Sequence, residues 1–553
     1  MNEYDRYLSP LDVLAIAFGC TVGWGAFSMP GSTFLPVAGP IGTVIAMVIG
    51  MAAMLIIGGN FSFLMKNNPG TGGVYAYTKD ALGRDHAFLC AWFLCLSYLT
   101  IVFLNATSLF TVIRTMFGRS LQVGFYYYHI AGNVIFMGEV GASIVALAIV
   151  GMLFINAKPL LQTLHTILAV VLLVAVLVVA GFCLPRLGSL QPAFGTQGGN
   201  RLHALFSIVM LTPWAFVGFE VISLETAHFD FKIHWSKAII IASILLSGLV
   251  YILLTLVSTC ATPDGYASWS AYIADLDKLD GVAAIPTFYA AKAIMGNVGL
   301  FVIAVAAIAA ILTGMIAAYR ATARILSTMA EDRILSEKFS NTTYSILTIM
   351  VISIVISIFG RNALNCFISL TSFGAIVAFG YSSASAWKIA RQMGNRKVTV
   401  TGAVGTVVSI VLLIVLMIPK LSALETMGSE AFLVLSLWCL LGFVFYLRTV
   451  ARAGVSTGTS ASSVVMFALL LYSVLMWLGK RLMAADSMQA VRGILYFEGS
   501  LMMFVIFLGL CVMMLIQRLM RKKHEMYERL NAERALSAEQ AAADAETPPD
   551  NEA

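Results

Sequence analysis

Long uncharged apolar segments, separated by short polar loops, fill nearly the whole chain. An α-helix of roughly 17 to 25 apolar residues is long enough to cross the hydrocarbon core of a bilayer, which is about 30 Å thick. The pattern therefore predicts an all-α integral membrane protein with about fourteen transmembrane helices. The expected spans are 11–35, 41–65, 87–113, 140–156, 159–183, 203–224, 238–261, 293–319, 344–360, 362–387, 399–419, 431–447, 463–479 and 499–517.

The composition agrees with this pattern. Of the 553 residues, 59% are hydrophobic and 11% are charged, whereas roughly 25% of residues are charged in soluble domains. If the N-terminus is cytoplasmic, roughly two thirds of the 34 Lys and Arg residues fall in cytoplasmic loops and ends, as the positive-inside rule requires. We therefore expect a multi-pass protein of the cell inner (cytoplasmic) membrane with both termini in the cytoplasm. This topology explains the net charge of +6, so nucleic acid is not an expected partner.

Two spans carry helix-breaking residues at their centres instead of at their ends. They are Gly19–Phe27 in the first span and Thr212–Glu220 in the sixth. If the chain contains inverted five-helix repeats, these spans run antiparallel and their broken centres meet at the midplane. An opened helix in lipid leaves costly unpaired N–H and C=O groups unless protein, a ligand or water lies beside it. The pattern favours a polar solute between the two spans. The alternative is that glycine and proline are simply common in membrane helices, where glycine lets neighbouring helices approach closely.

Four motifs stand out along the chain: Gly19–Pro30, Pro69–Thr78, Trp214–Glu220 and Arg324–Leu335. Together they are similar to the glycine-interrupted first helix, the Pro-x-x-Gly-Gly-x-Tyr loop, the unwound sixth helix and the inner end of the eighth helix of amino acid-polyamine-organocation (APC) superfamily permeases. The resemblance covers roughly residues 8–450, and it departs from the usual pattern where Arg333 and Ser336 replace Gly and Pro.

The resemblance implies a leucine-transporter-type fold and a domain organisation. Residues 1–450 would form a twelve-helix permease core, in which spans 1 to 5 and 6 to 10 are inverted repeats and spans 11 and 12 are peripheral. Residues 451–520 would add two transmembrane helices, for which we expect a packing or homo-oligomer role. The stretch 521–553 is rich in charge and alanine, which predicts a cytoplasmic tail that is partly disordered.

The resemblance also implies a function. The chain would be a secondary active transporter, either a symporter or an exchanger, that moves amino acids or related amines by alternating access. Its partners would be the solute and the lipid bilayer. It is not expected to be an enzyme, because the sequence shows no nucleophile–base spacing, metal-ligand cluster or phosphate loop. The alternative is a transporter-like membrane sensor that signals through its C-terminal tail.

The two broken segments supply the expected binding groups. N–H groups at the first break would bind the carboxylate of the solute, and carbonyl groups at the second would accept from its ammonium group. By the resemblance, Trp214 would close over the side chain of the solute; packing is the alternative role. The expected substrate-binding residues are Thr21, Gly23, Trp24, Gly25, Trp214, Phe216, Val217 and Gly218.

Two further residues are candidates for coupling or gating. A carboxylate deep in a span costs about 2.5 to 3.5 kcal/mol on insertion scales. Glu220 is therefore expected to take a proton or to brace its helix break by accepting backbone N–H bonds; an interhelical hydrogen bond is the alternative. The resemblance gives Thr313 a sodium-binding role, so Na⁺ or H⁺ is the candidate coupling ion, and no cofactor is expected. Residues that either line the cavity or form interhelical hydrogen bonds are Tyr98, Asn105, His165, Ser372, Tyr381 and Ser383.

Overall fold

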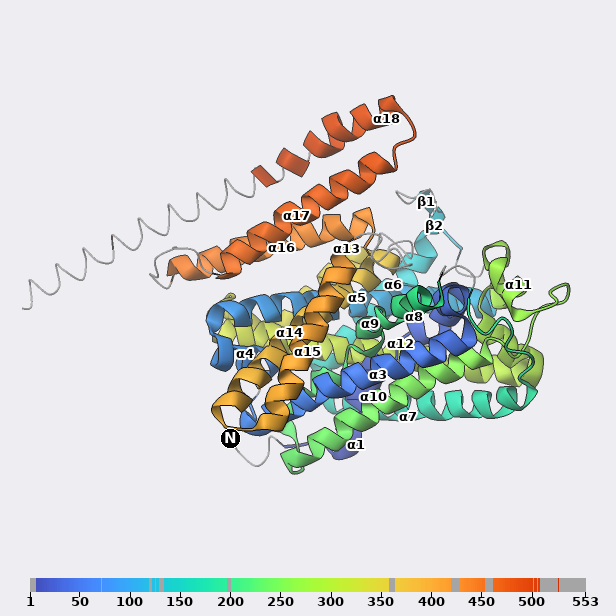
Figure 1. The fold of residues 1–553 in the computed structure, drawn as a ribbon, viewed down its shortest axis with the longest axis horizontal. Helices are drawn as coiled ribbons and strands as arrows, with labels where there is room; N and C mark the ends of the chain where they lie inside the picture. Colours follow the sequence, from blue (N-terminus) through green and yellow to red (C-terminus); the bar gives the residue numbers. More distant parts are fainter. Residues whose placement is uncertain are drawn as a thin grey trace, which may run out of the picture. The chain divides into compact units, whose positions relative to one another are not determined.

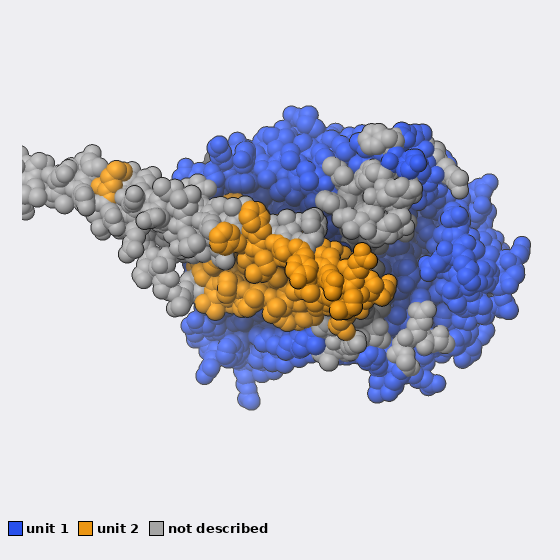
Figure 2. Space-filling view, turned by 90° about the horizontal axis from the view of Figure 1, so that it is seen from above, with its two compact units in different colours: residues 1–431 blue, residues 432–553 orange. Residues whose placement is uncertain are grey.

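The computed structural model (Figure 1) describes most of the chain. The chain divides into two compact units, Met1–Ala431 and Phe432–Ala553, which are blue and orange in Figure 2. The predicted domain boundary at residue 450 lies further along the chain and stays a prediction, and the predicted tail, 521–553, lies outside the described residues except for Met526. The described residues are 6–70, 72–118, 122–124, 126–128, 134–195, 200–357, 364–418, 427–452, 461–500, 502–504, 506–507 and 526.

Nearly all of the described residues are helical. Eleven of the described helices are long and apolar enough to cross a membrane, and two shorter apolar helices, Pro10–Thr21 and Thr342–Ser357, accompany them. This confirms the prediction of an all-α membrane protein. The last predicted span, 499–517, lies mostly outside the described residues. The count of fourteen spans and the inverted repeat therefore stay predictions.

The first unit is built around α5 (Arg84–Phe117), which is buried along its whole apolar stretch. The helices α12 (Pro286–Glu331) and α14 (Leu364–Gln392) pack against it. The elements as far as the second break are α1 (Pro10–Thr21), α2 (Gly25–Met29), η2 (Pro30–Phe34), α3 (Leu35–Asn67), α4 (Gly73–Leu82), α5, β1 (Tyr126–Tyr128), β2 (Val134–Phe136), α6 (Met137–Asn156), α7 (Lys158–Cys183), η3 (Leu184–Arg186), α8 (Arg201–Val209), α9 (Thr212–Phe216) and η4 (Phe219–Leu224).

The rest of the first unit continues with α10 (Ser236–Val257), which packs against α3 and runs alongside it in Figure 1. Two short elements precede α10, η5 (Thr226–His228) and η6 (Ile233–Trp235). The elements that follow α10 are α11 (Trp269–Ala274), η7 (Leu276–Lys278), η8 (Gly281–Ala284), α12, η9 (Glu337–Ser340), α13 (Thr342–Ser357), α14 and α15 (Arg396–Met417). The remaining elements are α16 (Ser429–Arg452), α17 (Ala461–Met483), α18 (Met488–Gly493) and η11 (Ile494–Gly499).

Two long helices contain a kink at a glycine. Gly39 has φ +69°, and a Cβ there would lie 2.6 Å from the backbone nitrogen of Gly195, so a side chain does not fit. The kink at Gly39 separates the first predicted span from the second within one continuous helical segment. Gly296, with φ +66°, separates the beginning of α12 from the rest. The apolar pattern predicts neither the kinks nor the antiparallel hairpin in which Tyr126 of β1 pairs with Phe136 of β2.

Candidate functional site

The first predicted break lies between α1 and α2. The helix α1 ends at Thr21, whose hydroxyl donates a hydrogen bond to a carbonyl of its own helix. Val22 is extended, with φ −100° and ψ 99°, and α2 begins at Gly25. Within the described part of the chain, the N–H groups of Gly23, Trp24 and Gly25 have no hydrogen-bond partner. The break therefore leaves adjacent donors free at the start of a helical segment.

The second predicted break lies between α9 and η4. Gly218 has φ +127°, and its N–H donates to Oε2 of Glu220 at 2.9 Å instead of to the Trp214 carbonyl one helical turn back. The other carboxylate oxygen, Oε1, accepts from the Tyr98 hydroxyl of α5 at 2.8 Å. The carboxylate is 1% exposed. Glu220 thus accepts a backbone N–H at the break, as in one of its two expected roles, and also forms the interhelical bond of the alternative.

The two breaks contact each other. A Cβ on Gly218 would lie 2.7 Å from Cβ of Cys20 and 2.8 Å from the backbone nitrogen of Thr21. A methyl group on Gly25 would overlap with the indole of Trp214. Glycine at these two positions therefore allows α1, α2 and the segment after α9 to approach this closely.

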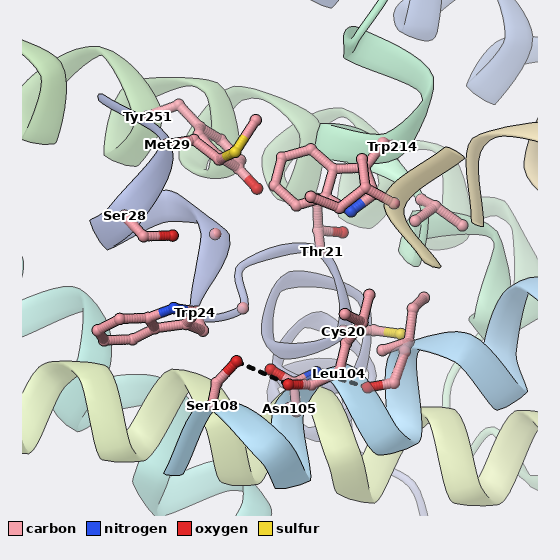
Figure 3. A pocket seen from close by; sticks show the side chains of 15 residues that line it. Cys20, Thr21, Trp24, Ser28, Met29, Leu104, Asn105, Ser108, Trp214 and Tyr251 are labelled. Carbon is pink, nitrogen blue, oxygen red and sulfur yellow. Dashed lines mark hydrogen bonds between the residues drawn. The ribbon is translucent and has the colours of Figure 1, made fainter. Parts of the chain in front are cut away.

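A cavity of about 50 Å³ lies between the breaks. Figure 3 shows Trp214 and Tyr251 on one side of this cavity and Trp24, Asn105 and Ser108 on the other. The ring centroids of Trp214 and Tyr251 are 6.4 Å apart. The lining residues are all uncharged: Cys20, Thr21, Gly23, Trp24, Gly25, Ser28, Met29, Ile101, Leu104, Asn105, Ser108, Trp214, Val217, Tyr251 and Ile368.

Most of the predicted substrate-binding residues meet at this cavity, but not all. Phe216 lies outside the lining, with its ring centroid 6.4 Å from that of Tyr251, and Gly218 faces α1. Neither Glu220 nor Thr313 lines the cavity. The substrate-binding and coupling roles of all these residues stay predictions. The predicted residues that do line it are Thr21, Gly23, Trp24, Gly25, Trp214 and Val217.

The helix α5 contributes lining residues that the broken-helix motifs do not reveal. Ile101, Leu104, Asn105 and Ser108 all line the cavity, and their spacing of three and four residues is typical of one helix face. Asn105 is one of the residues expected to line the cavity or to form an interhelical hydrogen bond; it lines the cavity, and its amide donates to the Ile101 carbonyl of its own helix at 3.0 Å. The spacing from Asn105 along the same helix face could have pointed to the other three. Tyr251 comes from α10 and has no such signal, because only the packing of α10 against the breaks brings it to the cavity.

Three of the other polar candidates form interhelical hydrogen bonds. Tyr98 donates to Glu220, as described above. Ser383 accepts from the amide of Asn60 at 3.2 Å. The Tyr381 hydroxyl lies 3.2 Å from Nδ1 of His86. Ser372, by contrast, donates to the Ile368 carbonyl in its own helix at 3.0 Å.

Thr313 of α12 and His165 of α7 meet α1 at Gly19. A Cβ on Gly19 would lie 2.8 Å from Cβ of Thr313 and 2.9 Å from Nε2 of His165. The Thr313 hydroxyl donates to the Ala309 carbonyl of its own helix at 2.8 Å. His165 is fully buried, and neither ring nitrogen has a hydrogen-bond partner among the described residues. The resemblance places a coupling ion beside the Thr313 hydroxyl. In this structure the imidazole of His165 lies next to that hydroxyl, at Gly19.

A second cavity, of about 600 Å³, lies toward the ends of α1, α7 and α12 that are predicted to be cytoplasmic. Its wall includes Glu225, which is 1% exposed and accepts from Nε and Nη2 of Arg324 at 3.2 and 3.3 Å. Nδ1 of His228 lies 3.1 Å from the same carboxylate. Burial by itself would raise the pKa of Glu225, but Arg324, His228 and Arg320 together lower it to about 2. We call this cavity the vestibule.

The C-terminal end of α12 is tied to α4, which follows the predicted glycine-rich loop. The carboxylate of Asp332 accepts from the Tyr75 hydroxyl at 2.5 Å and from the Lys79 ammonium at 2.7 Å, and Arg84 donates to the backbone carbonyl of Asp332. Burial opposes ionisation of Asp332, but these donors outweigh burial and lower its pKa. Arg333 follows, with φ +59°, a left-handed conformation that no other described non-glycine residue adopts.

Two broken helices that meet at a cavity, within a bundle of long apolar helices, are the arrangement typical of broken-helix membrane proteins. The sequence pattern of the Amino acid permease family matches residues 8–445. The chain therefore belongs to that family and, as its motifs predict, to the APC superfamily.

Several relatives are similar to the chain over part of their length. Cationic amino acid transporter 4 of Mus musculus is 24% identical, over 69% of this chain and 59% of its own length. The Methylthioribose transporter of Bacillus subtilis (strain 168) is 24% identical, over 61% of this chain and 69% of its own. Branched-chain amino acid permease BcaP of the same bacterium is 26% identical, over 47% and 55% respectively. The alignment thus spans about three fifths of the mouse transporter.

Proposed function

We propose that the chain is a secondary active transporter that binds an amino acid or a related amine between α2 and the break after α9. The observation that carries this proposal is the set of free N–H groups of Gly23, Trp24 and Gly25 at a cavity flanked by Trp214. Free N–H groups at the start of a helical segment attract a carboxylate, because they donate hydrogen bonds and the helix dipole adds positive potential. Membership in the amino acid permease family supports the same function.

The second break supplies an acceptor for the ammonium group. The Trp214 carbonyl has lost its helical donor, because the Gly218 N–H donates to Glu220. A carbonyl without a donor in a cavity is a favourable partner for an ammonium group. The carboxylate and ammonium groups of one solute would therefore bind to opposite breaks, and its side chain would face Trp214 and Tyr251.

The lining also supports a preference for uncharged side chains. Every described residue that lines the cavity is neutral. A lysine, arginine, aspartate or glutamate solute would place its side-chain charge there without a partner, which costs free energy in a low-dielectric site. We therefore propose neutral amino acids as preferred solutes, a choice closer to the name of the branched-chain permease than to that of the cationic transporter.

Transport would proceed by alternating access in the cytoplasmic membrane, with both termini in the cytoplasm. The vestibule, about 600 Å³, is far larger than the central cavity of about 50 Å³, which fits a conformation open toward the cytoplasm. The proposal includes three alternative modes: symport with Na⁺ beside Thr313, symport with a proton carried by Glu220, and exchange, which needs neither ion.

Uptake into proteoliposomes tests this proposal. Purified protein would be offered radiolabelled amino acids and their decarboxylated amines, with and without a sodium gradient, a proton gradient or internal amino acid. We expect saturable uptake of neutral amino acids, and the condition that stimulates it identifies the mode of transport. A folded, monodisperse preparation that takes up no amino acid or amine under any of these conditions would contradict the proposal.

A further inference from the structure

The vestibule contains a cationic side chain that the proposed transport site does not use. Arg320 lies on α12, seven residues after Thr313 and four before Arg324, so it is about 10 Å further along the helix than Thr313. It lines the vestibule together with Gln162 and Lys158 of α7. On the proposed transport path, a solute that leaves the central cavity toward the predicted cytoplasmic side would pass this position.

One terminal nitrogen of the Arg320 guanidinium forms a hydrogen bond, and the other has no partner among the described residues. Its Nη2 donates to Oε1 of Gln162, which fixes the orientation of the planar group. Its Nη1 is buried and has no hydrogen-bond partner among the described residues. A buried charged donor without a partner costs free energy, so such a group marks a place where an acceptor is favoured. A guanidinium matches the geometry of a carboxylate in particular.

The two carboxylates of the vestibule accept hydrogen bonds from donors other than Arg320. Asp12 of α1 accepts from the Thr166 hydroxyl at 2.6 Å and from the backbone N–H of Ser9 at 3.1 Å. Glu225 accepts from Arg324 through both of its oxygens. Neither carboxylate hydrogen-bonds to Arg320 in the described part of the chain.

The charges around the vestibule leave an excess of positive charge. Arg320, Arg324 and Lys158 line it, against Asp12 and Glu225. The neighbouring groups Tyr7 and His228 complete the ionisable side chains of the described wall. The excess cation favours a monoanionic group beside Arg320.

We propose that Arg320 forms a second binding station, in the vestibule, for the carboxylate group of the transported amino acid. This inference rests on the proposed function, because it assumes an amino acid that moves between the central cavity and the cytoplasm. The central cavity would select the side chain, whereas the vestibule is wide enough to accept any side chain and would recognise the carboxylate. Solute would therefore pass from backbone N–H groups at the break to a guanidinium on its way out.

Chemical labelling of the wild-type protein tests this station directly. The purified full-length chain would be treated with phenylglyoxal, an arginine-specific reagent, and the labelling rate of Arg320 measured by peptide mass spectrometry. L-Alanine is the probe, and ethylamine, which is alanine without its carboxylate, is the matched control. We expect L-alanine to slow the labelling of Arg320 at least fivefold, while ethylamine leaves it unchanged. The exposed Arg396 should be labelled at one rate throughout.

Three results with the wild-type protein would overturn the proposal. They are a labelling rate of Arg320 that L-alanine does not change, no labelling of Arg320 in the absence of ligand, and equal protection by inorganic phosphate, which would mean a general anion site. A Gly25→Ala variant, in which the central site is disturbed, should keep the protection by L-alanine, and loss of protection there would also count against a separate station. If uptake fails but protection persists, only the proposed function fails; if uptake succeeds without protection, only the station fails.

Discussion

Glu220 joins the break after α9 to α5 through one hydrogen bond from a backbone N–H and one from the Tyr98 hydroxyl. The change Glu220→Gln replaces one acceptor oxygen by a donor, so either the Gly218 N–H or the Tyr98 O–H loses its acceptor. An unsatisfied buried donor costs about 1 to 3 kcal/mol. We expect a lower unfolding temperature and a weaker apparent affinity for solute, measured by thermal unfolding and by uptake.

Tyr98→Phe is the matched control for this prediction, because it removes the hydroxyl but leaves the carboxylate and its bond to the Gly218 N–H in place. It should cost less than Glu220→Gln. If Glu220→Gln transports with the wild-type affinity and the wild-type pH dependence, Glu220 neither carries a proton nor braces the break.

Glu225 gives a pH dependence that can be measured. Its pKa of about 2 lies below the ordinary value of 4.5, because Arg324, His228 and Arg320 outweigh the effect of burial. A lowered pKa stabilises the fold above about pH 4.5, and this contribution is lost as pH falls from there toward about 2. The difference in unfolding temperature between wild type and Glu225→Gln should therefore be constant above pH 5 and shrink below it. A difference that grows as pH falls would contradict the ion pairing.

At the residue scale, the sequence predicts the cavity residues that lie in a helix-break motif. It does not predict those that only the packing of other helices brings to the cavity. Gly23, Gly25 and Trp214 belong to motifs whose glycines and proline mark a helix break. The position of the cavity along the chain can therefore be predicted from the sequence. Asn105 of α5 is found from its polarity within a predicted span, whereas Tyr251 and the neighbours of Asn105 on α5 carry no such mark. Phe216 sits next to lining residues in sequence, but its ring packs beside Tyr251 outside the cavity.

At the scale of elements, the backbone at the end of α12 shows what the departure from the family pattern at Arg333 costs. Gly is usual where this chain has Arg333, and Arg333 has φ +59° just after the helix ends. Its side chain is exposed, and a left-handed conformation costs a residue with a Cβ about 1 to 2 kcal/mol. Arg333→Gly should therefore raise the unfolding temperature without changing uptake, whereas Arg333→Ala should not raise it. Equal effects of the two substitutions would show that the backbone conformation is not the cause.

The positions of the helix breaks could be predicted because an interruption in lipid needs specific residues, here the glycines of the first span and the Thr-Pro and Gly of the sixth. The kink at Gly39 could not, since the apolar pattern continues on both sides and only the close approach of the Gly195 backbone requires it. The ion pair between Asp332 and Lys79 joins segments that lie far apart in the chain. Apolar periodicity holds no information about such pairs.

For the whole molecule, the division into two units separates the transporter proposal from the sensor alternative. All the residues of the proposed site and of the vestibule belong to the first unit, Met1–Ala431. A chain truncated after Arg448 should therefore keep solute uptake, with an apparent affinity within about threefold of the full-length value, which is less than 1 kcal/mol. The measurement is uptake into proteoliposomes at matched protein content. Loss of uptake by a truncated chain that is still folded would favour a required role for the C-terminal region.

The central claim is that the solute binds between the two helix breaks, and uptake by a Gly25→Ala variant tests it most directly. The added methyl group would overlap with the indole of Trp214 and displace it. Gly59→Ala in α3 is the control, because a Cβ at Gly59 meets nothing within 4 Å. We predict that Gly25→Ala raises the KM for a transported neutral amino acid at least tenfold while Gly59→Ala leaves it unchanged. An unchanged KM in a folded Gly25→Ala protein would contradict the account.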